Sequence, residues 1–88
     1  MRIQVRRTGG FAGIERQAEV GTSGRPDAQE WHTLAEQAVA AGQGVPPLGV
    51  PDGFSYEITV DGKTVYAADP ALTPEQRELI SRVLREGA

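Results

Sequence analysis

The sequence predicts an α+β fold: a two-layer sandwich in which a four-stranded antiparallel sheet carries two helices on one face, in the order ββαββα. Two observations lead to this prediction. Two stretches alternate apolar and polar residues around a glycine-containing turn, which is typical of β-hairpins. Each stretch is followed by an apolar stripe at helical spacing, and sheet and helices then bury their apolar faces against each other. The 88 residues suit a single domain, 1–88.

The first hairpin is predicted over residues 1–20. Residues 2–6 alternate polar and apolar side chains, as a strand with one buried face does. The Gly9-Gly10 pair can adopt positive φ, which tight hairpin turns require. The return strand places its apolar residues on one face: Ile14, Ala18 and Val20. Because Arg16 interrupts that face, we expect this strand to lie at a sheet edge or to carry a bulge near Gly13.

The first helix is predicted to start at Asp27 and to end at Gly42, since glycine commonly follows a helix. Glu30 lies three positions after Asp27, as in a capping box. The apolar residues fall at the spacing of one helix face: Trp31, Leu34, Ala35, Ala38 and Val39. We expect this face to pack on the sheet.

The second hairpin turns at Asp61-Gly62, a strong hairpin signal. The preceding strand has one apolar face: Phe54, Tyr56, Ile58 and Val60. A two-residue turn pairs Val60 with Lys63, Ile58 with Val65 and Tyr56 with Ala67. This register puts Tyr56 and Tyr66 on opposite faces of the sheet, so that one is expected to be buried and the other exposed.

The second helix is predicted to begin after Thr73, with Pro74 in its first position and Gln76 completing a capping box. Its apolar stripe comprises Leu79, Ile80, Val83 and Leu84. Gly87 marks its end.

Composition narrows the functional classes. The net charge of −3 argues against nucleic-acid binding. The chain has no cysteine, so we expect neither disulfides nor thiolate chemistry. The N-terminal sequence lacks the apolar region of a signal peptide, and no apolar run reaches the length of a membrane span. We therefore expect a cytoplasmic protein without membrane or nucleic-acid partners.

The basic residues are unevenly distributed. Residues 1–25 carry five arginines against two glutamates, a balance of +3. These arginines are Arg2, Arg6, Arg7, Arg16 and Arg25. We favour a solvated strand face over an anion-binding surface as the interpretation of this cluster.

Residues suited to catalysis are scarce. His32 is the only histidine, and Glu36 lies four positions later on the same helix face. Zinc sites need three or four ligands, so we favour a surface pair over a metal site. No serine has the G-x-S-x-G context of a nucleophile, and the glycine-rich turn lacks the Lys-Ser/Thr of a P-loop. We therefore predict a binding protein with no enzymatic activity, no cofactor and no metal.

Three blocks of the sequence resemble the emfourin family of small bacterial inhibitors of thermolysin-like zinc metallopeptidases. They are Met1-Arg-Ile-x-Val, Gly9-Gly-Phe-Ala-Gly-Ile14 with Glu19-Val20, and Pro51-Asp-Gly-Phe-x-Tyr-Glu-Ile-Thr-Val60 with Asp61-Gly62. The two helices match the family only in pattern. The resemblance implies a cytoplasmic or locally co-produced inhibitor of a protealysin-like peptidase, with the peptidase as protein partner and no cofactor of its own. We expect a monomer.

Two loops are candidates for the peptidase-binding site that this resemblance implies. The favoured loop comprises Gly21, Thr22, Ser23, Gly24, Arg25, Pro26 and Asp27. It offers extended backbone, Pro26 as a poor substrate residue and Asp27 as a carboxylate for the zinc, and it is a short linker between rigid elements. The second loop comprises Val45, Pro46, Pro47, Leu48 and Val50, with Leu48 and Val50 as pocket residues. Its proline-rich rigidity would lower the entropic cost of binding.

Other interpretations of the binding surface stay open. Both loops could be plain connectors while another surface binds. Phe11 could fill the end of the core, which we favour, or anchor a partner. The alternative function is an interaction module that adds a partner's strand to an exposed sheet edge, a role that the arginine-rich first strand suits.

Overall fold

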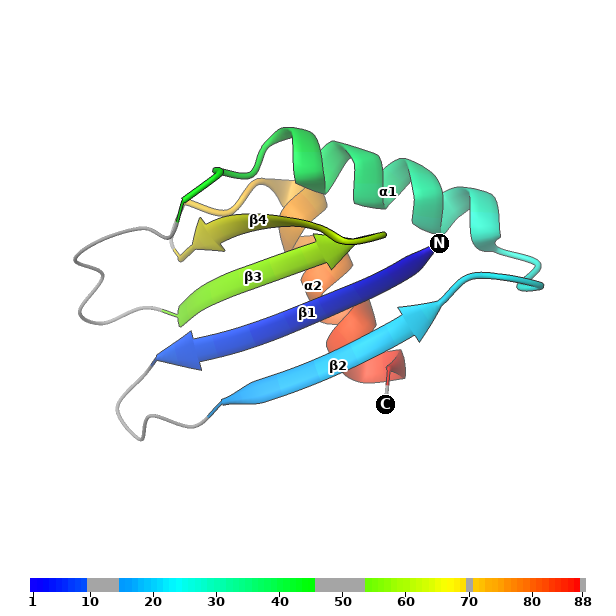
Figure 1. The fold of residues 1–88 in the computed structure, drawn as a ribbon, viewed down its shortest axis with the longest axis horizontal. Helices are drawn as coiled ribbons and strands as arrows, with labels where there is room; N and C mark the ends of the chain where they lie inside the picture. The colour runs from blue at the N-terminus through cyan, green and yellow to red at the C-terminus, as the bar shows by residue number, and fades with distance from the viewer. Residues whose placement is uncertain (10–14, 46–53, 70, 88) are drawn as a thin grey trace.

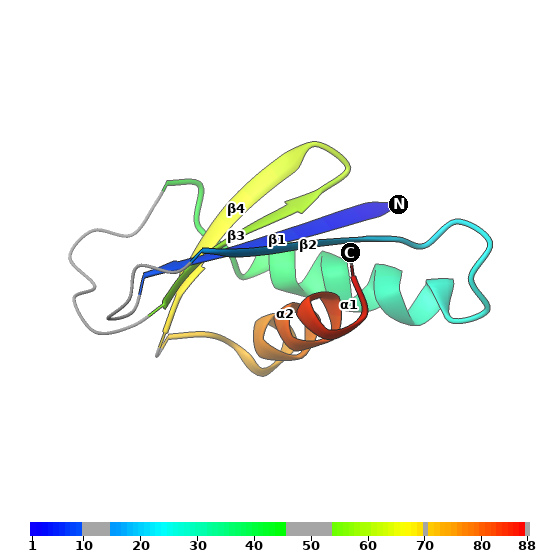
Figure 2. The same ribbon diagram turned by 90° about the horizontal axis from the view of Figure 1, so that it is seen from below.

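The computed structural model describes residues 1–9, 15–45, 54–69 and 71–87. Its elements follow the predicted order: β1 (Arg2–Gly9), β2 (Arg16–Gly21), α1 (Ala28–Ala40), β3 (Phe54–Val60), β4 (Lys63–Ala68) and α2 (Pro74–Glu86). The strands form one sheet in the order β2-β1-β3-β4, and all neighbours are antiparallel (Figure 1). Both helices lie on the same face of the sheet (Figure 2). The predicted fold class is therefore confirmed.

β1 is a central strand with a partner on each side. Ile3 pairs with Val20 of β2 and Val60 of β3, and the apolar side chains on this face are buried beneath the helices. β2 lies at the edge, as the interruption by Arg16 predicted. The expectation that the first strand offers a free edge is wrong, because β2 and β3 use both sides of its backbone. The expectations for Gly10, Phe11 and Ile14, and for a bulge near Gly13, lie outside the described residues.

The β3–β4 hairpin has the predicted register. Val60 pairs with Lys63, Ile58 with Val65 and Tyr56 with Ala67. Asp61 and Gly62 both have positive φ, 49° and 86°, as a type I′ turn requires. Tyr56 is buried against the helices, whereas Tyr66 lies half-buried on the opposite face.

α1 buries the predicted stripe and ends before Gly42 as predicted, but its N-terminal cap differs from the prediction. Asp27 is the N-cap residue, yet its side chain accepts no capping hydrogen bond, so the capping box with Glu30 is wrong. At the other end Gly42 follows the C-cap residue Ala41 and has no positive φ. A Cβ on Gly42 would lie 2.5 Å from Val65 Cγ2. Glycine is needed here because the end of α1 passes close to β4.

α2 begins with the predicted capping box. Thr73 Oγ1 accepts a hydrogen bond from Gln76 N at 3.1 Å, and Gln76 Oε1 accepts one from Thr73 N at 3.0 Å. The buried Gln76 also donates from Nε2 to the carbonyl of Ala38 in α1, at 3.2 Å. One side chain therefore caps α2 and joins the two helices.

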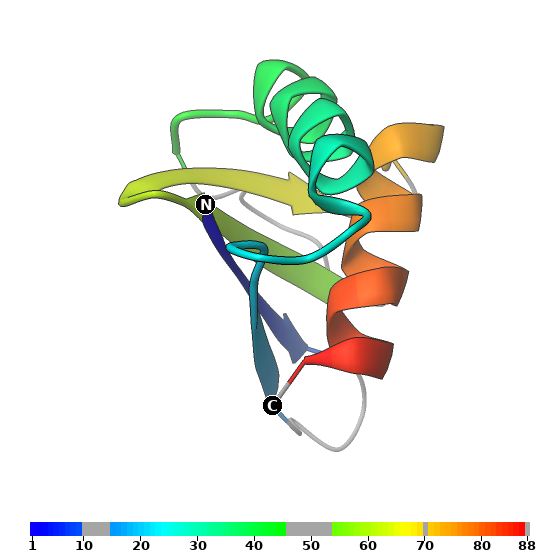
Figure 3. The same cartoon turned by 90° about the vertical axis from the view of Figure 1, so that its right-hand side faces the viewer.

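The helices cover the sheet crosswise. α2, which follows the second hairpin, packs on β1 and β2, whereas α1, which follows the first hairpin, packs on β3 and on α2. Figure 3 shows α1 almost end-on and α2 crossing it at a steep angle, both on the same side of the sheet. One apolar core is thus shared by both ββα halves of the chain.

The open face of the sheet is polar. Arg6 forms ion pairs with Glu15 at 2.8 Å and Glu57 at 3.2 Å, and Arg2 pairs with Glu19 at 3.4 Å. These two arginines lie on a solvated strand face, as favoured from the sequence, while Arg7 and Arg16 lie on the helix side. No helix in the described part of the chain is long and apolar enough to cross a membrane.

Candidate functional site

The predicted loop of residues 21–27 joins β2 to α1 and combines an exposed tip with a buried base, although its first residue, Gly21, is the last residue of β2. Ser23, Gly24 and Pro26 are exposed, as is Gly21, whereas Thr22 is fully buried. Gly24 has φ of 78°, a left-handed conformation that a side chain would strain. The chain therefore turns sharply at its tip, and the backbone of Ser23 and Gly24 is presented to solvent.

Thr22 fixes the first half of the loop. Its N–H and its hydroxyl both donate to the carbonyl oxygen of Met1, at 2.9 and 3.2 Å. His32 Nε2 lies 2.9 Å from Thr22 Oγ1. Since a hydroxyl has one proton, and that proton goes to Met1, His32 acts as the donor to Thr22. His32 thus supports the loop, and no hydrogen bond or ion pair with Glu36 is formed within the described residues.

Asp27 fixes the second half of the loop through its carboxylate. Arg25 Nε donates to Oδ1 at 2.9 Å, and Trp31 Nε1 donates to Oδ2 at 3.0 Å. The hydrogen bonds from Arg25 and then Trp31 stabilise the ionised form and lower the pKa of Asp27 to about 2. Both oxygens of this half-buried carboxylate are therefore engaged by neighbouring side chains, and its direction toward a zinc ion stays a prediction.

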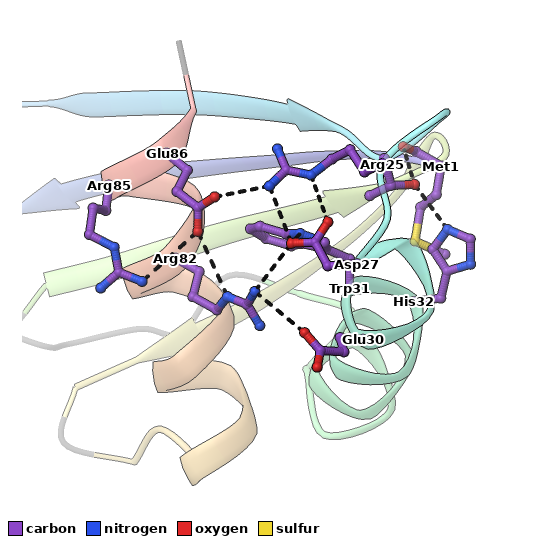
Figure 4. A network of polar contacts seen from close by, with 10 residues as sticks. Met1, Arg25, Asp27, Glu30, Trp31, His32, Arg82, Arg85 and Glu86 are labelled. Atoms are coloured by element: carbon purple, nitrogen blue, oxygen red, sulfur yellow. Dashed lines mark hydrogen bonds and ion pairs between the residues drawn. The ribbon is translucent and has the colours of Figure 1, made fainter.

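The C-terminal turns of α2 complete this cluster, which Figure 4 shows from close by. Glu86 accepts a hydrogen bond from Arg25 Nη2 at 3.0 Å, and Arg82 Nη2 lies 3.7 Å from the Asp27 carboxylate. The Arg82 and Arg25 guanidinium groups also lie 4.5 and 5.3 Å from the centre of the Trp31 ring, within the range of cation–π attraction. Contacts from α1, from α2 and from Met1 therefore hold the base of the loop.

Sequence reasoning located the linker between β2 and α1, whose role in binding stays a prediction, but it missed the residues that support this loop. Arg82 and Glu86 are spaced four apart on one helix, which signals only that they are neighbours on that helix. No local pattern reveals that this helix end lies beside residues 25–27. The sequence places Trp31 in the apolar stripe of the first helix, and this pattern does not reveal the hydrogen bond from its indole N–H to Asp27.

Only the start of the second candidate loop lies in the described residues. Val45 is 68% exposed and is the one large apolar side chain so exposed in the part of the chain that the structure describes. Pro46, Pro47, Leu48 and Val50 lie outside it. The two candidate loops adjoin opposite ends of the 13-residue helix α1, which spans about 20 Å. A single narrow cleft therefore cannot readily enclose both.

The described residues contain no cluster suited to metal binding. In residues 1–9, 15–45, 54–69 and 71–87, no group of three or more His, Asp or Glu side chains is arranged so that it could hold a metal ion. The fold and the loop together define a small α+β protein whose most distinctive local feature is an exposed turn on a well-supported base.

The comparison with known families identifies this class more closely. The family model for emfourin matches residues 5–84, nearly the whole chain. The chain therefore belongs to the emfourin family, as its hairpin blocks suggested. No curated protein and no solved structure matches the chain significantly. Family membership points to a protease inhibitor, which acts by binding a peptidase and needs no catalytic residues of its own.

Proposed function

We propose that this protein inhibits a thermolysin-like, protealysin-type zinc metallopeptidase by placing the loop of residues 21–27 in the active-site cleft. The match to the emfourin family carries this proposal. The inhibitor acts in the cytoplasm as a monomer, and it requires no cofactor. Its partner is the peptidase itself.

The support of the loop favours this segment as the contact surface. A peptide that is already ordered loses less conformational entropy on binding, about 0.5–1.5 kcal/mol less for each side chain that is held beforehand. Thr22 and Asp27 hold the two halves of the loop through the hydrogen bonds described above. A loop held in this way also resists the conformational change that cleavage of a bound peptide requires.

The residues of the loop divide into two roles. Ser23, Gly24 and Pro26 are exposed and form the surface that enters the cleft. Pro26 has no backbone N–H, which makes the segment a poor substrate. Thr22, Arg25 and Asp27 hold this surface in place from within, so the backbone of the tip and not the Asp27 carboxylate faces the catalytic zinc.

The first experiment is a titration of a thermolysin-like peptidase with the purified protein, using a small peptide substrate. We expect activity to approach zero near one equivalent. Ser23→Arg, at the exposed tip, should raise the inhibition constant at least about tenfold, equivalent to about 1.4 kcal/mol. Val45→Arg introduces the same side chain at the opposite end of α1 and should leave the constant unchanged.

Each pattern of results is decisive for the proposal. Loss of inhibition with Val45→Arg alone would assign contact to the second loop and contradict the first. Unchanged inhibition by both variants would place the contact on another surface. No inhibition by a large excess of the unmodified protein, against several such peptidases, would overturn the inhibitor function itself.

Both edges of the sheet are partly covered, which weighs against the alternative of a strand-adding module. At the β4 edge, Gln43 and Tyr66 exchange two backbone hydrogen bonds of 2.9 and 2.8 Å. At the β2 edge, Gly87 approaches so closely that a Cβ there would lie 2.8 Å from the Glu19 carbonyl oxygen. An edge module would bind a partner without reducing peptidase activity. Gln17→Pro would then abolish that binding, because the N–H of Gln17 points away from β1.

A further inference from the structure

We propose that a cleft between α2 and the β1–β2 hairpin binds a small organic oxyanion, a phosphate or carboxylate carried on an apolar group. The cleft lies on the side of α2 away from α1, and it is separate from the 21–27 loop. The inference is therefore independent of the proposed function.

Four arginines line this cleft: Arg7 and Arg16 from the sheet, and Arg77 and Arg85 from α2. Its volume is about 560 Å³, within the range of small-molecule sites. Apolar side chains complete the lining: Leu72, Ile80, Leu84 and the ring of Tyr56. The Ser81 hydroxyl adds a further hydrogen-bonding group. Positive charge thus surrounds an apolar surface.

The arginines of the cleft differ from the others in their partners. Among the described residues, Arg7, Arg16 and Arg77 form no ion pair, and Arg85 lies only within 3.9 Å of Glu86. Arg85 and the four arginines outside the cleft each lie within 4.0 Å of a carboxylate; those outside the cleft are Arg2, Arg6, Arg25 and Arg82. Arginines without carboxylate partners are therefore concentrated in one place, in a protein whose net charge is −3.

Arg7 is held in the cleft with part of its hydrogen-bonding capacity unused. Its Nε is buried and has no hydrogen-bond partner within the described residues. Its guanidinium lies 4.4 Å from the centre of the Phe54 ring, which fixes its position. Arg16 is fixed in a similar way, because its Nη2 donates to the Leu84 carbonyl at 2.8 Å. These contacts set the guanidinium groups in place before any ligand arrives.

No carboxylate from the described residues lines the cleft to neutralise this charge. Asp69 contacts the lining residue Tyr56, whose hydroxyl donates to it at 3.3 Å, but Asp69 itself stays outside the lining. Like charges held close together repel, and an oxyanion relieves that repulsion. Guanidinium groups bind phosphates and carboxylates with paired hydrogen bonds, and the apolar lining accommodates the rest of the ligand.

The test is a binding titration of the full protein followed by amide chemical shifts, at constant ionic strength. The probes are phenyl phosphate, benzoate and inorganic phosphate. We expect phenyl phosphate or benzoate to shift amides of Arg7, Tyr56 and Ser81 and to bind more tightly than inorganic phosphate. Whichever of the two binds more tightly identifies the charged group of the ligand.

Variants distinguish binding in this cleft from non-specific attraction of anions to the protein surface. Arg16→Gln and Arg77→Gln remove exposed side chains from the cleft and should each weaken binding about tenfold, as expected for a charge-assisted hydrogen bond. Arg2→Gln removes the same charge from the open face and should leave binding unchanged.

Three results would overturn the proposal. These are no shift at millimolar probe, inorganic phosphate binding as tightly as the aryl probes, or an equal loss of binding in Arg2→Gln. No peptidase is present in the titration, so its outcome does not depend on whether the protein is an inhibitor.

Discussion

At the scale of single residues, Asp27 shows how a local pattern can give the right position and the wrong role. Its place before an apolar stripe correctly marks the start of α1. Its carboxylate, however, binds Arg25 and Trp31 in preference to the free N–H groups of the helix. Both donors lie within four residues of Asp27, but a capping pattern does not specify which of the nearby donors the carboxylate accepts from.

Asp27 should contribute to the pH dependence of stability. Its pKa is lowered from the usual 3.8 to about 2, so its carboxylate stabilises the folded state fully above about pH 4. That stabilisation is lost as the pH falls through about 2, because the unfolded chain takes up the proton first. In urea unfolding experiments, the free energy of unfolding should therefore fall less for Asp27→Asn than for the unmodified protein when the pH is lowered from about 4 to about 2.

Glu36→Gln is the matched control for this measurement. Glu36 is exposed on the same helix and forms no ion pair within the described residues. Its replacement should preserve the acid dependence of the unmodified protein. An unchanged dependence in Asp27→Asn would contradict the role given to the Asp27 carboxylate.

Gly42 should tolerate no side chain. Gly42→Ala places a Cβ against Val65, and the overpacking should lower the free energy of unfolding by about 1–3 kcal/mol. Gly44→Ala is the control, because a Cβ there has no neighbour within 4 Å. Denaturant unfolding of the two variants measures this difference. Equal losses of unfolding free energy would show that the backbone geometry at the end of α1 matters here, and not the contact with β4.

At the scale of secondary-structure elements, most of the fold was predictable because its signals are local. The Asp61-Gly62 turn fixes the β3–β4 register, and the capping residues of α2 mark its first turn. The strand order was not predictable in the same way. The pairing of β1 with β3 depends on contacts between segments about fifty residues apart, for which the sequence carries no local code.

The N-terminus of α2 offers a test of one side chain with two functions. Thr73→Ala removes a cap hydrogen bond and should cost about 1 kcal/mol. Gln76→Met keeps most of the side-chain volume but removes both the reciprocal cap bond and the buried bond to Ala38, so it should cost more, about 2–3 kcal/mol. Chemical denaturation of both variants gives the comparison. A smaller loss for Gln76→Met than for Thr73→Ala would show that the bond to Ala38 adds nothing.

At the scale of the whole molecule, the candidate site combines predictable and unpredictable parts. The loop could be chosen from its glycines and its position between rigid elements. The support of the loop by Arg82 and Glu86 could not be predicted. These two residues reach the loop only because α2 packs across β1 and β2. The arginine-lined cleft likewise joins Arg7 and Arg16 to Arg77 and Arg85 through the same packing.

Crosswise packing should make unfolding a single event. Because each helix covers strands from the other half of the chain, neither half can keep its apolar surface buried alone. Native-state hydrogen exchange should therefore give the same opening free energy for the slowest amides of β1, β3 and α2. A markedly lower value for one half would contradict this expectation.

The same crossing has a consequence for how the protein is made. During synthesis the first hairpin leaves the ribosome early, but the helix that covers it emerges only after the second hairpin. Until then, Val5 and its apolar neighbours on the inner face have no permanent cover. On the outer face, Arg2 and Arg6 pair with glutamates, and these charges help to keep the uncovered hairpin in solution. A chain that stalls before α2 would become a target for chaperones or aggregation.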